Sequence, residues 1–214
     1  MKPSHGSKEI SFLRPECYNS YMTKMIESLC REAKRLGASE AVHIAAADIV
    51  VDDRTVLKCQ VPLCSHYGID LMCPPNVLPA AQFREILKCY RDAILVKVDI
   101  PTNDLRMQSG GPEPKYVDAA KDSRNKLHEI VCHLESQCIE KGHYFSAGFI
   151  GGPCPLCDSC VGAKSGLPCR HPFKARPAME AMGIDVMSTV GKAGLSLSFD
   201  RRSGRSWIGL VLVT

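Results

Sequence analysis

Four cysteines in one short loop constrain this chain more than any other feature of its sequence. The stretch "GGPCPLCDSCVGAKSGLPCRHP", residues 151–172, places two residues between Cys154 and Cys157, two between Cys157 and Cys160, and eight between Cys160 and Cys169. A loop this rich in glycine and proline, with little apolar content, has no core of its own to order it. A metal bound by the thiols would supply that order.

The chain carries twelve cysteines in 214 residues, a length sufficient for one substantial core. In a secreted protein this count would indicate disulfides, but the start "MKPSHGSKEISF" has neither an apolar region nor a small-residue cleavage site. We therefore expect a cytoplasmic protein whose clustered cysteines bind metal. The longest apolar run, "AVHIAAADIVV", is broken by His43 and Asp48, so no membrane span is expected.

The formal net charge of +4 indicates no particular partner. An iron–sulfur cluster bound by four thiolates carries about −2 and one bound by three about −1, so two clusters would nearly cancel the positive charge. The sequence has no basic run with interleaved aromatic residues, which argues against a nucleic-acid partner.

Helical and strand patterns alternate along most of the chain and predict an α/β fold. We expect helices at 18–37, 80–92, 116–141, 176–183 and 185–194, strands at 41–51, 55–59, 93–100 and 143–150, and a closing hairpin of 195–200 and 206–214. Helices alternate with strands early and antiparallel pairing comes late. The sequence therefore predicts a single metal-binding domain over 1–214, with a mixed central sheet, flanking helices and two cysteine-rich loops, 59–75 and 151–172.

The spacing of the loop at 151–172 favours an iron–sulfur cluster over zinc. Structural zinc sites usually combine two separated C-x2-C pairs, and a third cysteine at the same spacing overfills such a pair. The bacterial ferredoxin run begins C-x2-C-x2-C, which matches Cys154, Cys157 and Cys160, whereas Cys169 lies further off than the ferredoxin fourth ligand. Gly151 and Gly152 would let backbone amides approach cluster sulfides. A structural zinc site is the alternative.

The loop at 59–75 contains only three cysteines, Cys59, Cys64 and Cys73, with the last followed by two prolines. A second cluster here would lack one protein thiolate. His66 is the nearest non-cysteine candidate for the missing ligand, although a loop histidine bonded to backbone is the simpler interpretation. The rival source of an eighth thiolate is one of three cysteines on or near helices, Cys17, Cys30 or Cys89.

The remaining candidates have simple structural interpretations. Cys132 and Cys138 are six residues apart on the long helix and do not share a face, so each is expected to be a buried free thiol. His171 either donates a hydrogen bond to a cluster or is a turn residue whose hydrogen bonds are satisfied within the turn. Arg170 and Arg176 could hold an anion, but an ion pair of Arg176 with Glu180 is the structural alternative.

The segments "LKCQVPLCSHYGIDLMCPPN" and "GPCPLCDSCVGAKSGLPCRHPFKARPAMEAMGIDV" resemble the family of predicted metal-binding proteins catalogued as domain of unknown function 2284. The resemblance covers most of the chain. It implies that seven cysteines stand at motif positions, namely Cys59, Cys64, Cys73, Cys154, Cys157, Cys160 and Cys169. It also implies an origin in anaerobic archaea or bacteria. Ala178 stands where a serine is usual, which argues against a catalytic hydroxyl at that position.

Three functions fit these observations. The first is an electron-transfer or redox-accessory module with two [4Fe–4S] clusters and a redox partner protein, because no dinucleotide or Walker fingerprint is present. The second is an enzyme whose three-cysteine cluster keeps an iron open for a small-molecule substrate. The third is a zinc-stabilised interaction protein. The electron relay of the first requires the cysteine loops to lie close together, which we expect because functional loops of α/β sheets gather at one edge.

Overall fold

The computed structural model describes residues 15–101, 114–197 and 205–214, and the side chains from residue 20 onward within these ranges. The helices are α1 Pro15–Arg35, α2 Asp53–Gln60, α3 Ala80–Leu87, α4 Pro114–Glu140 and α5 Val186–Lys192. The strands are β1 Glu40–Ala45, β2 Asp92–Asp99, β3 Ala147–Phe149 and β4 Ser206–Val213. Three single 3₁₀ turns complete the described elements: η1 Ala46–Asp48, η2 Ala163–Ser165 and η3 Glu180–Met182.

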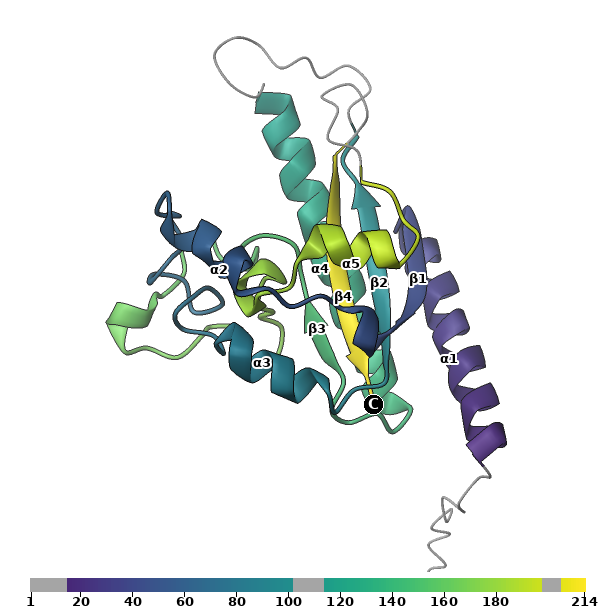
Figure 1. The fold of residues 1–214 in the computed structure, drawn as a ribbon. Coiled ribbons are helices and arrows are strands. Elements are labelled where there is room, and N and C mark those ends of the chain that lie inside the picture. Colours follow the sequence, from purple (N-terminus) through teal and green to yellow (C-terminus); the bar gives the residue numbers. More distant parts are fainter. Residues whose placement is uncertain (1–14, 102–113, 198–204) are drawn as a thin grey trace, which may run out of the picture.

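The four strands form one antiparallel sheet in the order β1-β2-β4-β3 (Figure 1). The prediction of a single α/β domain is confirmed, but the sheet is not mixed. The helix α4 carries the chain from β2 to β3, and these two strands run in the same direction. They do not pair, because β4 inserts between them and is antiparallel to both. The parallel pairing seen in the described residues is an isolated bridge between Ile150 and Ala178.

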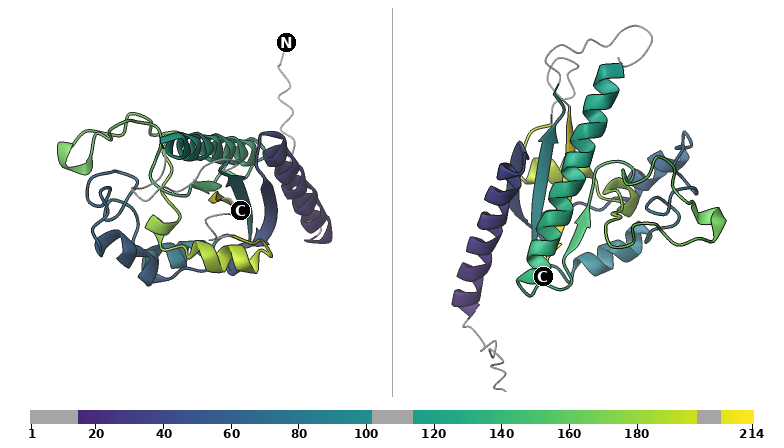
Figure 2. Two further views of the ribbon diagram at one scale, coloured as in Figure 1. Left: turned by 90° about the horizontal axis from the view of Figure 1, so that it is seen from above. Right: turned by 180° about the vertical axis from the view of Figure 1, so that it is seen from behind.

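Helices cover both faces of the sheet (Figure 2). Residues of β2 alternate between the two faces, and both sets are buried. Ile94, Val96 and Val98 pack under α1 and α4, whereas Ala93 and Leu95 pack on the side of α3 and α5. A strand buried on both faces needs a continuous apolar run rather than an alternating one. This explains why "AILV" at the start of β2 was recognisable from sequence.

Glycines allow α4 to approach the sheet closely. A Cβ atom at Gly148 or at Gly209 would lie 2.7 Å from a methyl carbon of Val131 on α4. Real Cβ atoms do not come this close to other carbons, so the helix would have to move outward. The absence of side chains at these two positions therefore sets the spacing between α4 and the strands β3 and β4, of which β3 leads to the second cysteine loop.

Several local predictions are wrong. Residues 55–59, expected as a strand, belong to helix α2, which begins after the N-cap Asp52 accepts a hydrogen bond from the Arg54 backbone N–H. The strand expected over 41–51 ends at Ala45 and continues as η1. The helix expected at 176–183 is reduced to the single turn η3.

The closing hairpin is only partly tested. Residues 198–200 of its first arm lie outside the described residues, and Leu195–Leu197 form no strand. Its second arm is β4, whose partners are β2 and β3. Within the ranges that the structure describes, none of the helices combines the length and the apolar character that a membrane span requires.

Replacing Gly183 by alanine is expected to destabilise the domain by about 2–4 kcal/mol. Gly183 follows η3 with φ +81°, a left-handed conformation, and an added Cβ would lie 2.5 Å from the Cβ of Ala80 on α3. Gly194 is a matched control, because its φ is +70° but no atom lies within 4 Å of an added Cβ. Urea unfolding should give a clearly smaller loss for Gly194→Ala. Equal losses of stability in the two variants would mean that Ala80 on α3 moves away from the added Cβ at no cost.

Candidate metal centre

The first cysteine loop, residues 59–75, starts in the last turn of α2 and leads toward α3. Successive turns fold it back on itself. The Cys64 N–H donates to the Cys59 carbonyl at 3.0 Å, and the Cys73 N–H donates to the Asp70 carbonyl at 3.1 Å. The Gly68 N–H donates to the Pro74 carbonyl at 2.8 Å, which ties the middle of the loop to its end. Cys73 is buried, whereas Cys59 and Cys64 are half-buried.

The second cysteine loop, residues 151–172, leaves the sheet after β3. Gly151 and Gly152 press against β4, since an added Cβ at Gly151 would lie 2.8 Å from the Ile208 carbonyl oxygen and one at Gly152 would lie 3.0 Å from the Trp207 ring. These glycines therefore serve the close approach of the loop to β4, a reason that the sequence did not reveal. The four cysteines that follow are all half-buried and free.

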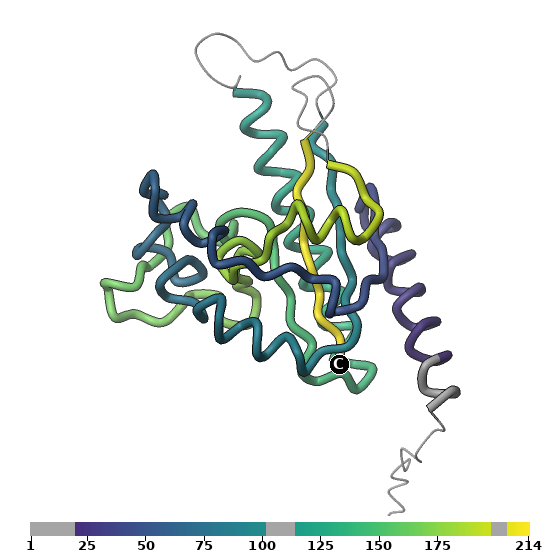
Figure 3. The backbone as a smooth tube through the Cα atoms, viewed as in Figure 1, coloured from purple at the N-terminus to yellow at the C-terminus, as the bar shows by residue number. Residues whose placement is uncertain are grey.

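The two loops lie side by side beyond the β3 edge of the sheet, although about eighty residues separate them in sequence (Figure 3). The Ala163 N–H of the second loop donates to the Ile69 carbonyl of the first at 2.9 Å. Both loops line a cavity of about 350 Å³, here called the inter-loop cavity. The prediction that the loops are neighbours is confirmed. The predicted reason was partly wrong, because the first loop follows a helix rather than a strand.

The seven motif cysteines divide between three environments. Four of them, Cys154, Cys157, Cys160 and Cys169, line the inter-loop cavity. Cys59 and Cys64 line a different cavity, of about 740 Å³, on the other side of the first loop. Cys73 is buried, with an exposed fraction of 7%. The second loop thus brings its four thiols to one cavity wall, whereas the three thiols of the first loop do not share one.

The thiols of the two loops influence one another electrostatically. Burial, together with the neighbouring charges of Asp70, Cys64, Cys59 and Cys154, raises the pKa of Cys73 to about 12. Burial also raises the pKa of Cys154, although backbone N–H groups of Leu156 and Arg176 partly oppose this effect. Thiolates gathered this closely repel one another unless a cation lies between them. Several thiols together are therefore a favourable place for a metal.

The donor chemistry of the loops fits a thiolate-bound metal. Soft thiolate ligands select zinc, Cu(I) or iron–sulfur clusters. Amides already point at two of the sulfurs, since the His171 N–H donates to the Cys169 Sγ at 3.3 Å and the Cys154 thiol has the backbone contacts described above. In the part of the chain that the structure describes, however, no three cysteine, histidine, aspartate or glutamate side chains stand in an arrangement that could hold a metal ion.

His66 faces the inter-loop cavity and is bonded to a carboxylate rather than to backbone. Its Nδ1 lies 2.6 Å from the Asp70 Oδ2. Metal-binding histidines generally use one ring nitrogen on a carboxylate or carbonyl, which orients the other toward the metal. Asp70 therefore orients His66 in the way that a ligand role would require.

Of the other cysteines, only Cys132 lies near a motif thiol among the described residues, since the charge of Cys154 contributes to its raised pKa. Cys30 on α1 packs in the core, and Cys138 on α4 is fully buried. Burial raises the pKa of each thiol to about 11. Cys89 is exposed after α3. The side chain of Cys17 lies outside the described residues. Cys132 is half-buried on α4, with its sulfur 3.6 Å from the Lys174 carbonyl oxygen.

The predicted ion pair between Arg176 and Glu180 is wrong. Arg176 instead donates through Nε to the Glu135 Oε2 on α4 at 2.6 Å. One carboxylate oxygen of Glu180, Oε2, is buried without a hydrogen-bond partner among the described residues, and burial raises the pKa of this carboxyl. Arg170 donates to the Ser159 carbonyl at 2.9 Å and braces the second loop. Both arginines therefore have structural partners.

Sequence reasoning missed Arg124, which lies on α4 and lines the inter-loop cavity. Its guanidinium lies 6.0 Å from the Trp207 ring centre, and its Nε is buried without a hydrogen-bond partner among the described residues. Desolvation lowers its pKa, and the charge of Cys154 opposes this shift. Arg124 stands among other basic residues of α4, such as Lys121 and Lys126, so no sequence pattern distinguished it from a solvated surface charge.

An antiparallel sheet that carries two neighbouring cysteine loops at one edge defines a cysteine-rich protein of the metal-binding class. The family model described as "Predicted metal-binding protein (DUF2284)" matches residues 42–213. The chain belongs to this family, as its two cysteine motifs indicated. No curated protein and no solved structure matches the chain.

Proposed function

We propose that the protein binds two iron–sulfur clusters of the [4Fe–4S] type, one at each cysteine loop, and acts as an electron-transfer or redox-accessory module in the cytoplasm of an anaerobe. The observation that carries this proposal is the direct hydrogen bond between the loops and the cavity that they share. Two cofactors held this close together suit a relay of electrons. Iron–sulfur clusters supply one-electron transfer when bound.

The second loop would hold its cluster through Cys154, Cys157, Cys160 and Cys169. Their presence around one cavity supports a common cofactor, and their spacing favours a cluster over zinc. The backbone N–H groups that already approach Cys154 and Cys169 would stabilise negative charge on sulfur. Arg124, the cation in the wall of the same cavity, would do so as well.

The first loop would hold its cluster through Cys59, Cys64 and Cys73. The fourth ligand is proposed to be His66, because Asp70 fixes its ring beside the loop and the other described cysteines lie elsewhere. Metal binding would have to draw the three sulfurs together. The turns that close this loop leave its outer part free of core contacts, which allows such a movement.

A partner protein is proposed as the source or acceptor of electrons. Apolar side chains beside both loops support this idea, because they remain exposed to solvent. The exposed fraction is 69% for Val61, 72% for Leu63, 61% for Leu167 and 90% for Phe173. Large apolar side chains left this exposed near a cofactor site could contribute to a protein–protein contact.

An enzymatic function is the second candidate, and one observation favours it. The cavity of about 740 Å³ next to Cys59 and Cys64 is large enough for a small-molecule substrate. An open metal position on the first loop would then face this cavity. In this case the protein would transform a bound compound instead of only passing electrons.

Metal analysis of anaerobically purified protein tests the proposal. The expected result is about eight iron atoms per chain, with two reducible [4Fe–4S] signals by electron paramagnetic resonance. Stoichiometric zinc without iron would reject the proposal in favour of a zinc-stabilised interaction protein. Four irons per chain would reject the two-cluster relay.

Replacing His66 by alanine should make the first-loop cluster open to added ligands. Cyanide is expected to change one of the two electron paramagnetic resonance signals in the variant at least tenfold faster than in the wild type, because an iron without a protein ligand exchanges freely. The other signal should not respond. His171→Ala is the control, because His171 contacts Cys169 through its backbone N–H. Equal cyanide sensitivity of wild type and H66A would remove His66 from the ligand set.

A further inference from the structure

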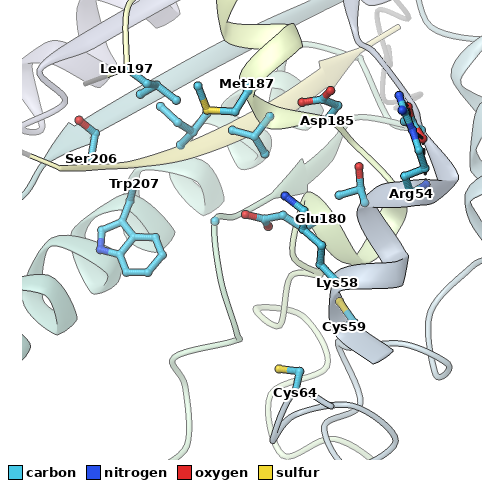
Figure 4. A pocket seen from close by; sticks show the side chains of 15 residues that line it. Arg54, Lys58, Cys59, Cys64, Glu180, Asp185, Met187, Leu197, Ser206 and Trp207 are labelled. Atoms are coloured by element: carbon cyan, nitrogen blue, oxygen red, sulfur yellow. Dashed lines mark hydrogen bonds and ion pairs between the residues drawn. The ribbon is translucent and has the colours of Figure 1, made fainter. Parts of the chain in front are cut away.

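The cavity next to Cys59 and Cys64 exists because β3 is short. This strand pairs with Leu210–Leu212, so among the described residues no strand covers this edge of the first half of β4. Helix α2, the turn η3 and the start of α5 surround this edge and enclose about 740 Å³ (Figure 4). We call this space the β4-edge cavity.

One wall of the β4-edge cavity is apolar. It is formed by side chains from β4, α5 and the segment before β4, namely Val186, Met187, Leu197, Trp207 and Ile208. The Trp207 ring is held in place because its Nε1–H donates to the Ala120 carbonyl on α4 at 2.8 Å. Met187 is 41% exposed although it lines this wall. Such a wall has apolar surface to offer a ligand.

The opposite side of the cavity is polar, and most of its charges are already paired. Arg54 binds both carboxylate oxygens of Asp52. Asp185 accepts from the N–H and the hydroxyl of Ser188. These groups stabilise α2 and α5 and need no ligand.

Two polar groups of this cavity remain without partners among the described residues. The Glu180 Oε2 is buried and accepts no hydrogen bond. Lys58, on α2, forms no ion pair or hydrogen bond in the part of the chain that the structure describes. Figure 4 shows both side chains extending into the cavity, between Trp207 and the two cysteines. An ammonium can donate to an anionic oxygen, and two carboxyl groups that lie side by side can share one proton between their oxygens.

We infer that the β4-edge cavity binds a small organic acid with an apolar body. Its carboxyl group would accept from Lys58 and share a proton with the Glu180 Oε2, and its body would lie against Trp207 and Met187. The wall between these two ends contains Cys59 and Cys64, so the ligand would be held beside the first cysteine loop. This inference goes beyond electron transfer and does not depend on which metal the loops bind.

Trp207 makes the inference testable, because it is the single tryptophan of the chain. The protein as purified anaerobically is titrated with 3-phenylpropionate, and binding is followed by tryptophan fluorescence and by calorimetry. A dissociation constant below about 1 mM is expected for a ligand of this size. The neutral amide and the amine of the same carbon skeleton should bind at least fivefold more weakly.

Two lysine variants test whether Lys58 contacts the ligand. Lys58→Ala is expected to weaken 3-phenylpropionate binding about fivefold, the effect of one partly exposed ion pair. Lys192→Ala is the matched control: Lys192 is another exposed lysine in the last turn of a short helix, but it does not line the cavity. Its variant should bind like the wild type.

Three results would overturn the inference: no binding of the acid, tighter binding of the amine, or equal binding by wild type and Lys58→Ala. Iron is measured in every preparation. A protein that binds the acid but contains zinc would keep this inference and reject the iron–sulfur proposal. A protein with two clusters and no affinity for the acid would keep the iron–sulfur proposal and reject this inference.

Discussion

Replacing Cys157 by serine is expected to remove about half of the bound iron and to lower the melting temperature by about 10 °C. The second loop lies outside both hydrophobic clusters of the core, and its cysteines are half-buried around a cavity. The loop is therefore expected to gain its order from a bound metal, whose loss would cost folding free energy. A loss of about 3 kcal/mol or more lowers the melting temperature of a domain of this size by roughly 2–4 °C per kcal/mol.

Cys89→Ser is the matched control, since Cys89 is exposed after α3 and lines neither cysteine cavity. It should keep all of the iron and melt like the wild type. Iron content is measured by colorimetric assay and unfolding by circular dichroism under argon. If C157S kept its iron and its melting temperature, Cys157 would not be a ligand.

The sequence predicted the parts of the fold that depend on local patterns. The apolar run of β2 and the periodicity of α4 identified a buried strand and a long helix correctly. The strand expected at 55–59 was wrong because "TVLKC" favours a strand by residue type, whereas Asp52 caps a helix there. The insertion of β4 between β2 and β3 depends on contacts across more than fifty residues, and no local pattern encodes it.

The candidate site was predictable to a similar extent. The spacing of the cysteines marked both loops, and their hydrogen-bonded contact confirms that they are neighbours. The groups around them were not predictable. Arg176 was expected to pair with Glu180, four residues away, but it pairs with Glu135, 41 residues away. With Arg176 paired elsewhere, the Glu180 Oε2 has no hydrogen-bond partner among the described residues, and Glu180 lines the β4-edge cavity, which no local pattern predicted.

Replacing Arg176 by methionine is expected to destabilise the domain by about 3–5 kcal/mol. Glu135 is 8% exposed and accepts hydrogen bonds from Arg176 and from the Gly148 N–H of β3. The Arg176 guanidinium also donates to the carbonyls of Phe173 and Ala175. This pair thus joins α4, β3 and the chain just after the second loop. Removing the cation alone would leave a buried carboxylate without its counter-charge, which is the costly way to break such a pair.

The double variant Glu135→Gln with Arg176→Met should recover part of this loss, because it removes both charges and keeps the amide as a hydrogen-bond partner for Gly148. The exposed pair of Lys88 and Glu85, at 66% and 68% side-chain exposure, is the control. Lys88→Met should cost less than about 1 kcal/mol. Urea unfolding of the four proteins forms the comparison. If Arg176→Met cost no more than Lys88→Met, the Glu135 carboxylate would be solvated or protonated without its partner. The end of the second loop would then be held by its metal alone, and C157S would release it entirely.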